Sequence, residues 1–336
     1  MTDPNPETQE KKFNFLGLAI GLGVSLVALL ILFNLIDFDE VLQSIKEVDL
    51  SVFPWLILLF LISMVTRSIA WRTILQEKIS LGRTFLTINE GYLFNNILPF
   101  RLGEVARAFL LNQTEKIPFW EVLSTIMVER IVDIAFLATV LLGTIPFVAG
   151  VGSAEQAAYA SAIIVIVGFS ILFWIARNPQ KTTALFEKLT SPWPKITDFG
   201  REKLESILNG LSALQDFKRF IKVLFFILLS WSFNIAWYTL LLQAFVPEAK
   251  LLWGIFAVGF ISLGVSIPSS PGYVGVFEAA MTYALSLFGV PESTAFAYAV
   301  VGHSLYLVIT IAIGSIALGR DGQSLGQVYR GIRNRD

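Results

Sequence analysis

Stretches of about twenty apolar residues recur along the chain and predict membrane-spanning helices. A helix needs roughly 20 mostly apolar residues to cross the hydrocarbon core of a bilayer. Five stretches meet this length and a sixth nearly does: 15–36, 52–75, 122–148, 157–176, 223–246 and 295–318. The pattern therefore predicts an all-α, polytopic membrane protein with about six full spans.

Two further apolar regions, 84–112 and 251–288, are interrupted near their centres by polar residues, proline and glycine. The first contains Asn95, Asn96, Pro99, Arg101 and Glu104, and the second contains a Ser, Pro and Gly-rich stretch over 266–275. Irregular backbone at membrane depth survives only where protein buries it or where it lines water. We therefore predict a broken or re-entrant helix pair in each region.

The distribution of basic residues favours a cytoplasmic location for both termini. If 84–112 is a re-entrant hairpin, 19 lysines and arginines fall on the cytoplasmic side, and only Lys46 and Lys250 fall outside. Such an excess is typical of cytoplasmic loops. A full span at 84–112 would instead place the basic loop 177–222 outside. We expect a protein integral to the cytoplasmic (inner) membrane.

The two broken regions would then enter the membrane from opposite faces, as an inverted repeat does. Transporters built in this way bind substrate near the midplane. The two interruptions share an order of residue types, Pro99, Gly103 and Glu104 in the first and Pro271, Gly275 and Glu278 in the second. This faint similarity is compatible with an internal repeat.

One membrane domain is expected over 15–318, between cytoplasmic tails at 1–14 and 319–336. The loop 177–218 contains an amphipathic stretch, 196–217, which we interpret as an interfacial helix. Neither a cleaved signal peptide nor a C-terminal enzyme domain is expected.

Composition narrows the function classes further. The 336 residues are 55% hydrophobic and 15% charged, with a net charge of −1, which gives no argument for a nucleic-acid partner. Cysteine is absent, which excludes disulfides and thiolate ligands, and one histidine cannot build a His-rich metal site. Because no Walker-type glycine-rich loop occurs, we expect no nucleotide, metal or other cofactor.

The first candidate motif begins at the break in the first hairpin. Pro99 suits the first turn of a helix, and Arg101, Glu104 and Arg107 follow at three-residue spacing, so they share a face. Free N–H groups at a helix start attract anions, and two arginines could hold a phosphate. Alternatively, Glu104 neutralises one of these arginines and holds the hairpin shut.

The second motif places Glu129 and Asp133 four residues apart, with Arg130 about 100° away from Glu129 around the helix. Two like charges on one stripe require a cation between them, which could be Arg67, Arg101 or Arg107. The motif could belong to a binding site or could be a buried ion pair that joins helices.

The third motif lies in the second broken region. Ser270 and Pro271 resemble an N-cap and the first residue of a helix, in which Glu278 would lie two turns further on. Gly272 and Gly275 would let a ligand or another helix approach the backbone. Binding and close packing are equally compatible with this pattern.

Nine charged residues lie at apparent membrane depth: Arg67, Glu90, Arg101, Glu104, Arg107, Glu129, Arg130, Asp133 and Glu278. Each would cost roughly 2.5–3.5 kcal/mol at a lipid-facing helix centre, or on the order of 25 kcal/mol together. They must therefore face inward, pair or line water, which favours a hydrated, charged cavity. His303, in the last span, is interpreted as an interhelix hydrogen-bond contact in preference to a proton relay.

Three segments together resemble the lysylphosphatidylglycerol synthase transmembrane-region family of flippase-like proteins. They are Asn96-x-x-Pro-x-Arg-x-Gly-Glu-x-x-Arg107, Glu129-Arg-x-x-Asp133 and Pro268-x-x-Pro-Gly-x-x-Gly-x-x-Glu278. Tyr273 departs from this resemblance, since a second glycine would be expected there. The resemblance implies lipid translocation, and it implies roles for Asn96, Gly103 and the charged residues of the three motifs.

We therefore expect a translocase that moves a phospholipid or polyprenyl-linked head group through the cavity. Arg101 and Arg107 would hold the phosphate, and Glu104, Glu129, Asp133 and Glu278 would bind a cationic head group or exchange protons. One alternative is an intramembrane enzyme with a Glu129–Asp133 pair and His303 as base. Others are a small-solute transporter, or a subunit that recruits a lipid-modifying enzyme or cell-envelope glycosyltransferase through the basic loop 177–222.

Overall fold

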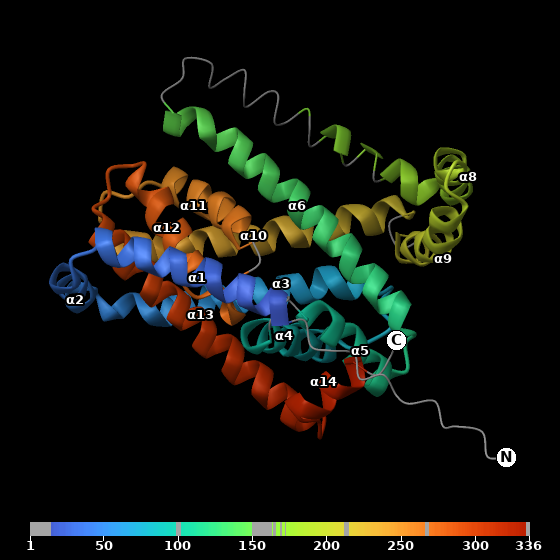
Figure 1. The fold of residues 1–336 in the computed structure, drawn as a ribbon, viewed down its shortest axis with the longest axis horizontal. Coiled ribbons are helices and arrows are strands. Elements are labelled where there is room, and N and C mark those ends of the chain that lie inside the picture. The colour runs from blue at the N-terminus through green and yellow to red at the C-terminus, as the bar shows by residue number, and fades with distance from the viewer. Residues whose placement is uncertain are drawn as a thin grey trace.

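The computed structural model describes residues 15–98, 102–149, 163, 166–168, 170–171, 173–211, 215–265 and 269–333. Every regular element in these residues is a helix (Figure 1). The fold is that of an all-α polytopic membrane protein, as the hydrophobic pattern predicts.

The first half of the chain contains α1 (Phe15–Leu35), α2 (Phe38–Glu47), η1 (Leu50–Val52), α3 (Phe53–Ile74), α4 (Leu81–Ile97), α5 (Gly103–Glu115) and α6 (Phe119–Ala149). The second half contains α8 (Pro179–Thr190), α9 (Pro194–Leu211), α10 (Phe217–Phe245), α11 (Leu251–Gly264), η4 (Pro271–Tyr273), α12 (Val276–Ser286), α13 (Glu292–Arg320) and α14 (Leu325–Arg333).

Three helical segments in the described part are long and apolar enough to cross a bilayer: Leu50–Ile74, α10 and α13. A fourth is obtained if the pair Leu22–Leu35 and Phe38–Glu47, bent by 88°, counts as one span. The predicted span 122–148 falls on α6, which has 31 residues. Half of the span predicted over 157–176 lies outside the described residues.

The first broken region forms an antiparallel hairpin of α4 and α5, as predicted. With 17 and 13 residues, both helices are shorter than a full span. Gly91 of α4 lies directly against Gly103 of α5, and the Asn95 Oδ1 atom accepts a hydrogen bond of 2.8 Å from the Gly103 backbone N–H. Lys116, with φ of 58°, ends α5 in the left-handed conformation.

The second broken region is also a hairpin, formed by α11 and α12. Gly264 lies against Ala280, and the Trp253 and Phe288 rings stack 5.1 Å apart. Ser270 and Pro271 are the N-cap and the first residue of a helical turn, as predicted, but this turn is the short 3-10 helix η4 and Ser270 makes no side-chain cap. The predicted continuation of one helix from Pro271 to Glu278 is wrong.

The physical reason is the backbone that follows this turn. Gly272, Tyr273 and Gly275 have φ of 66°, 61° and 88°, which no α-helix tolerates. Consequently α12 begins at Val276, and Glu278 lies in its first turn, not two turns into the helix.

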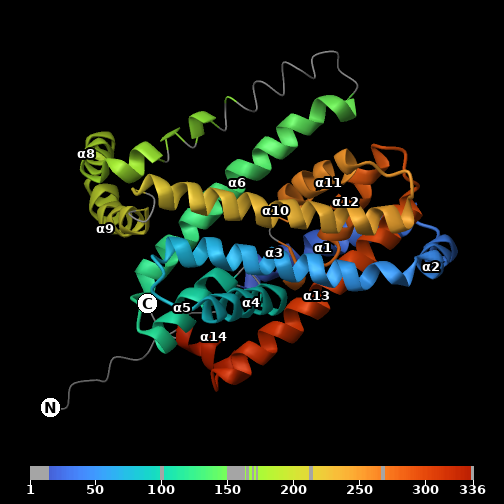
Figure 2. The same cartoon turned by 180° about the vertical axis from the view of Figure 1, so that it is seen from behind.

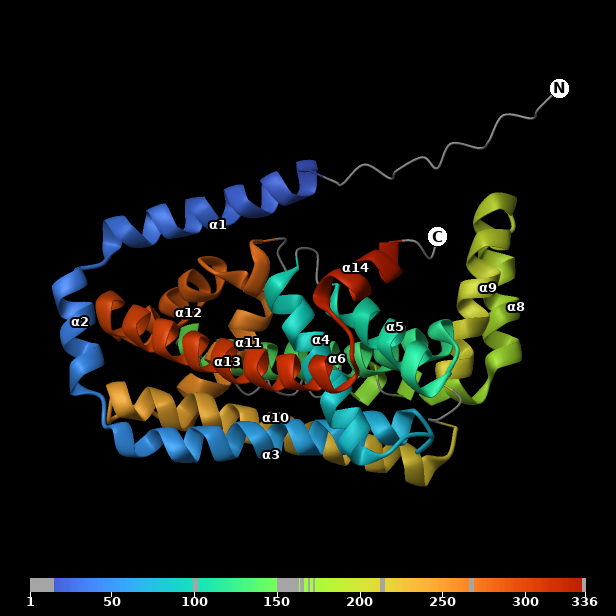
Figure 3. The same cartoon turned by 90° about the horizontal axis from the view of Figure 1, so that it is seen from below.

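The two halves of the chain pack in matching ways (Figures 1 and 3). The α3 and α10 helices run antiparallel against each other, α4 packs on α13, and α11 packs on α6. In each half the second hairpin helix packs on the long helix that follows it, α5 on α6 and α12 on α13. The hairpins enter from opposite ends of the bundle, which supports an inverted internal repeat.

The loop 177–218 contains two helices where one was expected. Seen from behind in Figure 2, α8 and α9 lie side by side at one end of the molecule, and α9 also packs on α6. The expected interfacial helix over 196–217 corresponds to α9 up to Leu211, and α10 already begins at Phe217. At the C-terminus, α14 packs on α5 through the buried Val328.

Candidate functional site

A cavity of about 230 Å³ lies where the tips of the two hairpins meet. Both halves of the chain line it. The charged and polar lining residues of the first half are Arg67, Tyr92, Asn95, Glu104, Arg107 and Arg130, and those of the second half are Trp231, Asn234, Tyr238, Ser262, Tyr273, His303 and Tyr306. A polar site deep in an apolar bundle is the arrangement that the intramembrane charges predict.

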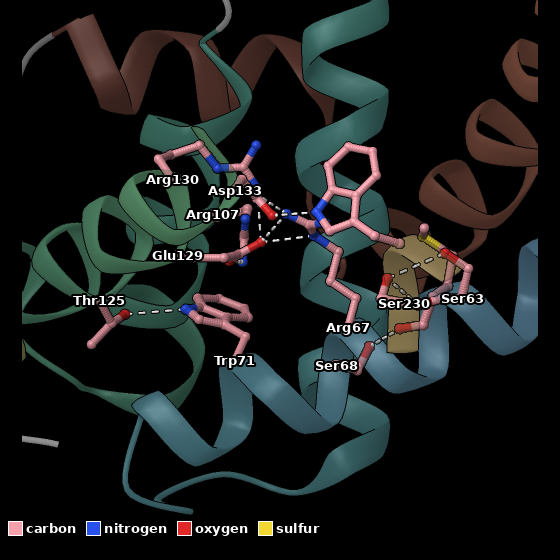
Figure 4. Close-up of polar contacts among 12 residues, drawn as sticks. Ser63, Arg67, Ser68, Trp71, Arg107, Thr125, Glu129, Arg130, Asp133 and Ser230 are labelled. Atoms are coloured by element: carbon pink, nitrogen blue, oxygen red, sulfur yellow. Dashed lines mark hydrogen bonds and ion pairs between the residues drawn. The ribbon is translucent and has the colours of Figure 1, made fainter. Parts of the chain in front are cut away.

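Arg67 of α3 lies between the two carboxylates of α6 (Figure 4). Its Nε atom donates a hydrogen bond of 2.8 Å to Glu129, and its Nη2 atom donates to Asp133. All three side chains are buried. Arg67 is thus the cation that the spacing of Glu129 and Asp133 requires, and it joins α3 to α6.

Arg107 of α5 reaches the same carboxylate cluster from the hairpin. Its Nη2 atom donates to Glu129 over 2.9 Å, and its guanidinium lies 3.9 Å from the centre of the Trp71 ring. Trp71 in turn donates to Thr125 over 3.1 Å. These contacts fix Arg107 in place, so it lies at the cavity wall as a positioned charge.

Arg130 is the most accessible cation of the cluster. It pairs with Glu129 at 2.8 Å and Asp133 at 2.9 Å on its own helix, yet its side chain is 38% exposed and lines the cavity. Arg67 and Arg107 are only 7% and 6% exposed in their side chains. Because three guanidinium groups face two carboxylates, this cluster carries one positive charge in excess.

Glu278 and His303 form a second polar pair, between α12 and α13. The His303 Nδ1 and Glu278 Oε1 atoms are 2.6 Å apart, and Glu278 Oε2 accepts a hydrogen bond of 2.6 Å from the Gly275 backbone N–H. The His303 ring stacks on Phe277, with 4.2 Å between the ring centres. His303 therefore makes the interhelix contact that the sequence favours.

Asn96, which the sequence assigned to the binding site, is not among the residues that line this cavity. Its side chain donates to Thr310 over 2.8 Å and so joins α4 to α13, whereas its neighbour Asn95 lines the cavity. Adjacent residues point about 100° apart on a helix, and here Asn95 is the one of the two that lines the cavity. The Asn96 backbone oxygen also lies close to Gly272, where the hairpin tips touch.

The remaining predicted residues divide into three groups. Pro99 and Arg101 lie outside the described residues. Glu104 lines the cavity, and its Oε2 atom has no hydrogen-bond partner within the described ranges. Glu90 lies elsewhere, paired at 3.2 Å with Arg83, which also binds Asp321 at 2.7 Å.

Sequence reasoning missed the contribution of α10. Trp231, Asn234 and Tyr238 all line the cavity, and the Trp231 Nε1 atom donates to Asp133 over 2.8 Å. Their three- and four-residue spacing, which places polar and aromatic side chains on one face of an apolar span, is the signal that could have identified them.

No group of three or more His, Asp or Glu residues in the described ranges is arranged to hold a metal ion. The polar part of the described lining consists of charged groups, amides, hydroxyls and aromatic rings.

Comparison with known proteins covers most of the chain. The family model described as the lysylphosphatidylglycerol synthase TM region matches residues 15–314. The Haloferax volcanii protein named Glycosyltransferase AglD is 26% identical over 335 residues, which cover 88% of this chain and 53% of that protein. The Methanocaldococcus jannaschii UPF0104 membrane protein MJ1595 is 22% identical over 311 residues, which cover 88% of this chain and 92% of that protein. The chain thus spans about half the length of the Haloferax relative.

Proposed function

The chain belongs to the lysylphosphatidylglycerol synthase transmembrane-region family, and on that premise we propose that it moves a lipid head group across the bilayer. The substrate class is a phospholipid or a polyprenyl-linked lipid. The observation that carries this proposal is the charged cavity between the two hairpin tips, where Arg130 is partly exposed within an apolar bundle.

Arg130 is the residue to which we assign the lipid phosphate. A guanidinium holds phosphate through two parallel hydrogen bonds, and the excess positive charge of the cluster favours an anion. Arg67 and Arg107 support this site by neutralising Glu129 and Asp133. The phosphate role first expected of Arg107 is therefore assigned to its more accessible neighbour.

The opposite wall of the cavity suits the rest of the head group. Glu104 has an unpartnered carboxylate oxygen within the described ranges, and His303 has an unpartnered Nε2 atom there. These atoms, together with Asn95 and Asn234, can bind hydroxyl or amine groups. A cavity of about 230 Å³ holds a head group but no acyl chains, so the chains stay in the bilayer.

An intramembrane enzyme acting on the head group is the principal alternative. A Glu129–Asp133 pair with His303 as base would require these groups to be available to substrate. Arg67 instead holds both carboxylates, although the Nε2 atom of His303 has no hydrogen-bond partner within the described ranges. These contacts favour transport over chemistry.

A partner enzyme remains part of the proposal. One relative carries the name Glycosyltransferase AglD, and this chain covers only 53% of it. A glycosyltransferase or other lipid-modifying enzyme is therefore the partner class that we propose. Its contact would be the basic loop 177–222, in which Lys181 and Lys188 form the exposed basic surface of α8.

Purified protein in liposomes with isotope-labelled lipids separates the two main functions. Transport predicts that intact lipid reaches the opposite leaflet, and an enzyme predicts a head group of altered mass. Unaltered lipid that stays in its leaflet, across anionic and aminoacylated lipids, would argue against both.

A further inference from the structure

In each half of the fold a buried polar pair of the described residues joins the hairpin to the helix that follows it. In the first half, Arg107 of α5 pairs with Glu129 of α6 at 2.9 Å. In the second half, Glu278 of α12 pairs with His303 of α13 at 2.6 Å. The hairpin helix supplies the basic side chain of the pair in the first half and the acidic side chain in the second. An Arg–Glu pair stays charged at all physiological pH values, whereas an imidazole gains and loses a proton there.

The surroundings of His303 leave one nitrogen available. A carboxylate only accepts hydrogen bonds, so the His303 Nδ1 atom carries the proton that it shares with Glu278. The Nε2 atom has no hydrogen-bond partner within the described ranges, and His303 lines the cavity although it is only 2% exposed. This lone pair at the cavity wall is thus the position at which the ring could accept a second proton.

We propose that His303 takes up a proton when an anionic head group enters the cavity. The proton comes from the buffered aqueous solution and bonds to the Nε2 lone pair, which produces an imidazolium paired with the Glu278 carboxylate. The inference rests on the proposed function in one respect, that the same cavity receives the anion.

The charged groups around the cavity favour this linkage. Besides Glu278, the described charges that border the cavity or pair with its lining are Arg67 of α3, Glu104 and Arg107 of α5, and Glu129, Arg130 and Asp133 of α6. Four carboxylates thus face three guanidinium groups. A proton on His303 brings this set to neutrality, and an entering anion makes that proton more favourable still.

Tyrosines are the other titratable groups that face the cavity, one each from α4, η4, α10 and α13: Tyr92, Tyr273, Tyr238 and Tyr306. The α11 helix contributes no titratable side chain to the described lining. Tyrosines stay neutral across the range in which an imidazole titrates. Among the described neutral side chains of this lining, the imidazole is therefore the one whose type can gain a proton near neutral pH.

The expected size of the effect follows from Coulomb's law. At a separation on the order of 10 Å and an effective dielectric constant of about 20, one added negative charge raises proton affinity roughly tenfold. Linkage is reciprocal, so protonation tightens anion binding by the same factor.

The chain's single histidine makes a direct test feasible. Protein carrying isotope-labelled histidine is placed in phosphatidylcholine nanodiscs, and its imidazole is titrated by NMR with and without sn-glycerol 3-phosphate. The proposal predicts a titration midpoint about one pH unit higher with the anion. An unchanged midpoint at saturating anion would overturn it.

Phosphatidylglycerol nanodiscs provide a second arm, in which the lipid itself is the anion. Surface charge alone also raises the midpoint there, so Arg130→Gln serves as the matched control, because it keeps the surface effect and loses the proposed anion site. A larger rise in the wild type than in Arg130→Gln supports the proposal. Equal rises would assign the whole effect to the surface and contradict it.

Failure of this inference is distinguishable from failure of the proposed function. If the protein moves lipid in liposomes but the titration midpoint of His303 is the same with and without the anion, proton linkage alone is overturned. Proton linkage without lipid movement would leave an anion-binding cavity that does not translocate.

Discussion

The carbonyl oxygen of Gly91 occupies the space that a Cβ atom on Gly103 would need. The Asn95 side chain would also lie within 2.6 Å of that atom. The two helices of the first hairpin therefore cross backbone to backbone, and this contact sets the distance between Arg107 and the acidic pair on α6.

Gly103→Ala should open this crossing. Because backbone atoms cannot move aside as a flexible side chain does, we expect a loss of about 1–3 kcal/mol in stability, measured by thermal unfolding in detergent. Gly82→Ala, in the same hairpin, is the control, since no atom lies within 4 Å of its added Cβ. Equal stability of Gly103→Ala and the wild type would contradict this packing.

Arg67→Gln should be among the most destabilising single changes. It removes the buried cation between Glu129 and Asp133 and leaves the partly exposed Arg130 as the guanidinium that contacts Asp133 in the described ranges. Breaking a buried pair in this way costs about 3–5 kcal/mol. Arg130→Gln should cost much less, because its side chain is 38% exposed and Arg67 still holds both acids. Chemical unfolding in detergent compares them, and equal losses would refute the assigned roles.

The sequence predicted the main features of this fold for two reasons. A membrane span needs a long apolar stretch, and charged residues at membrane depth must be buried or paired. Both broken helix pairs were predicted from prolines and charges in otherwise apolar stretches. The need for a cation beside Glu129 and Asp133 was predicted from their spacing, although three arginines qualified. Only packing in three dimensions identifies Arg67 as that cation.

Other features depend on geometry that spacing does not encode. Asn95 and Asn96 are equivalent by composition, and the rotation of α4 decides which one faces the cavity. The left-handed backbone from Gly272 to Gly275 moved the start of α12 past Ser270. The α10 residues Trp231, Asn234 and Tyr238 were not predicted to line the cavity, because the prediction relied on charged residues and these three are uncharged.

Loss of the hydrogen bond between Asn96 and Thr310 should lower the stability of the protein more than its binding of lipid. Asn96→Leu removes the hydrogen bond that joins α4 to α13 and leaves Thr310 with only its backbone partners. We expect a loss of about 1 kcal/mol, measured by thermal unfolding. Asn95→Leu removes the Gly103 contact as well as a cavity amide, so it should also slow lipid movement. Slower movement in properly folded Asn96→Leu would reverse this assignment.

The exposed basic surface of α8 tests the recruitment alternative. Lys181 and Lys188 are solvent-exposed, and their double change to Glu should leave lipid movement by the purified protein unchanged. Binding to a partner enzyme with an acidic surface should weaken, which co-purification measures. If the double variant loses lipid movement in the absence of any partner, α8 belongs to the transport machinery.

Movement of a head-group-labelled anionic lipid between leaflets of liposomes that contain only this protein tests the central claim most directly. The wild type should move the lipid, and Arg130→Gln, with its helical content intact, should be at least about tenfold slower, since a hydrogen bond to a charged group contributes about 1.5–3 kcal/mol. Equal rates for the two proteins, or no movement by the wild type, would contradict the assignment of the cavity as a lipid head-group path.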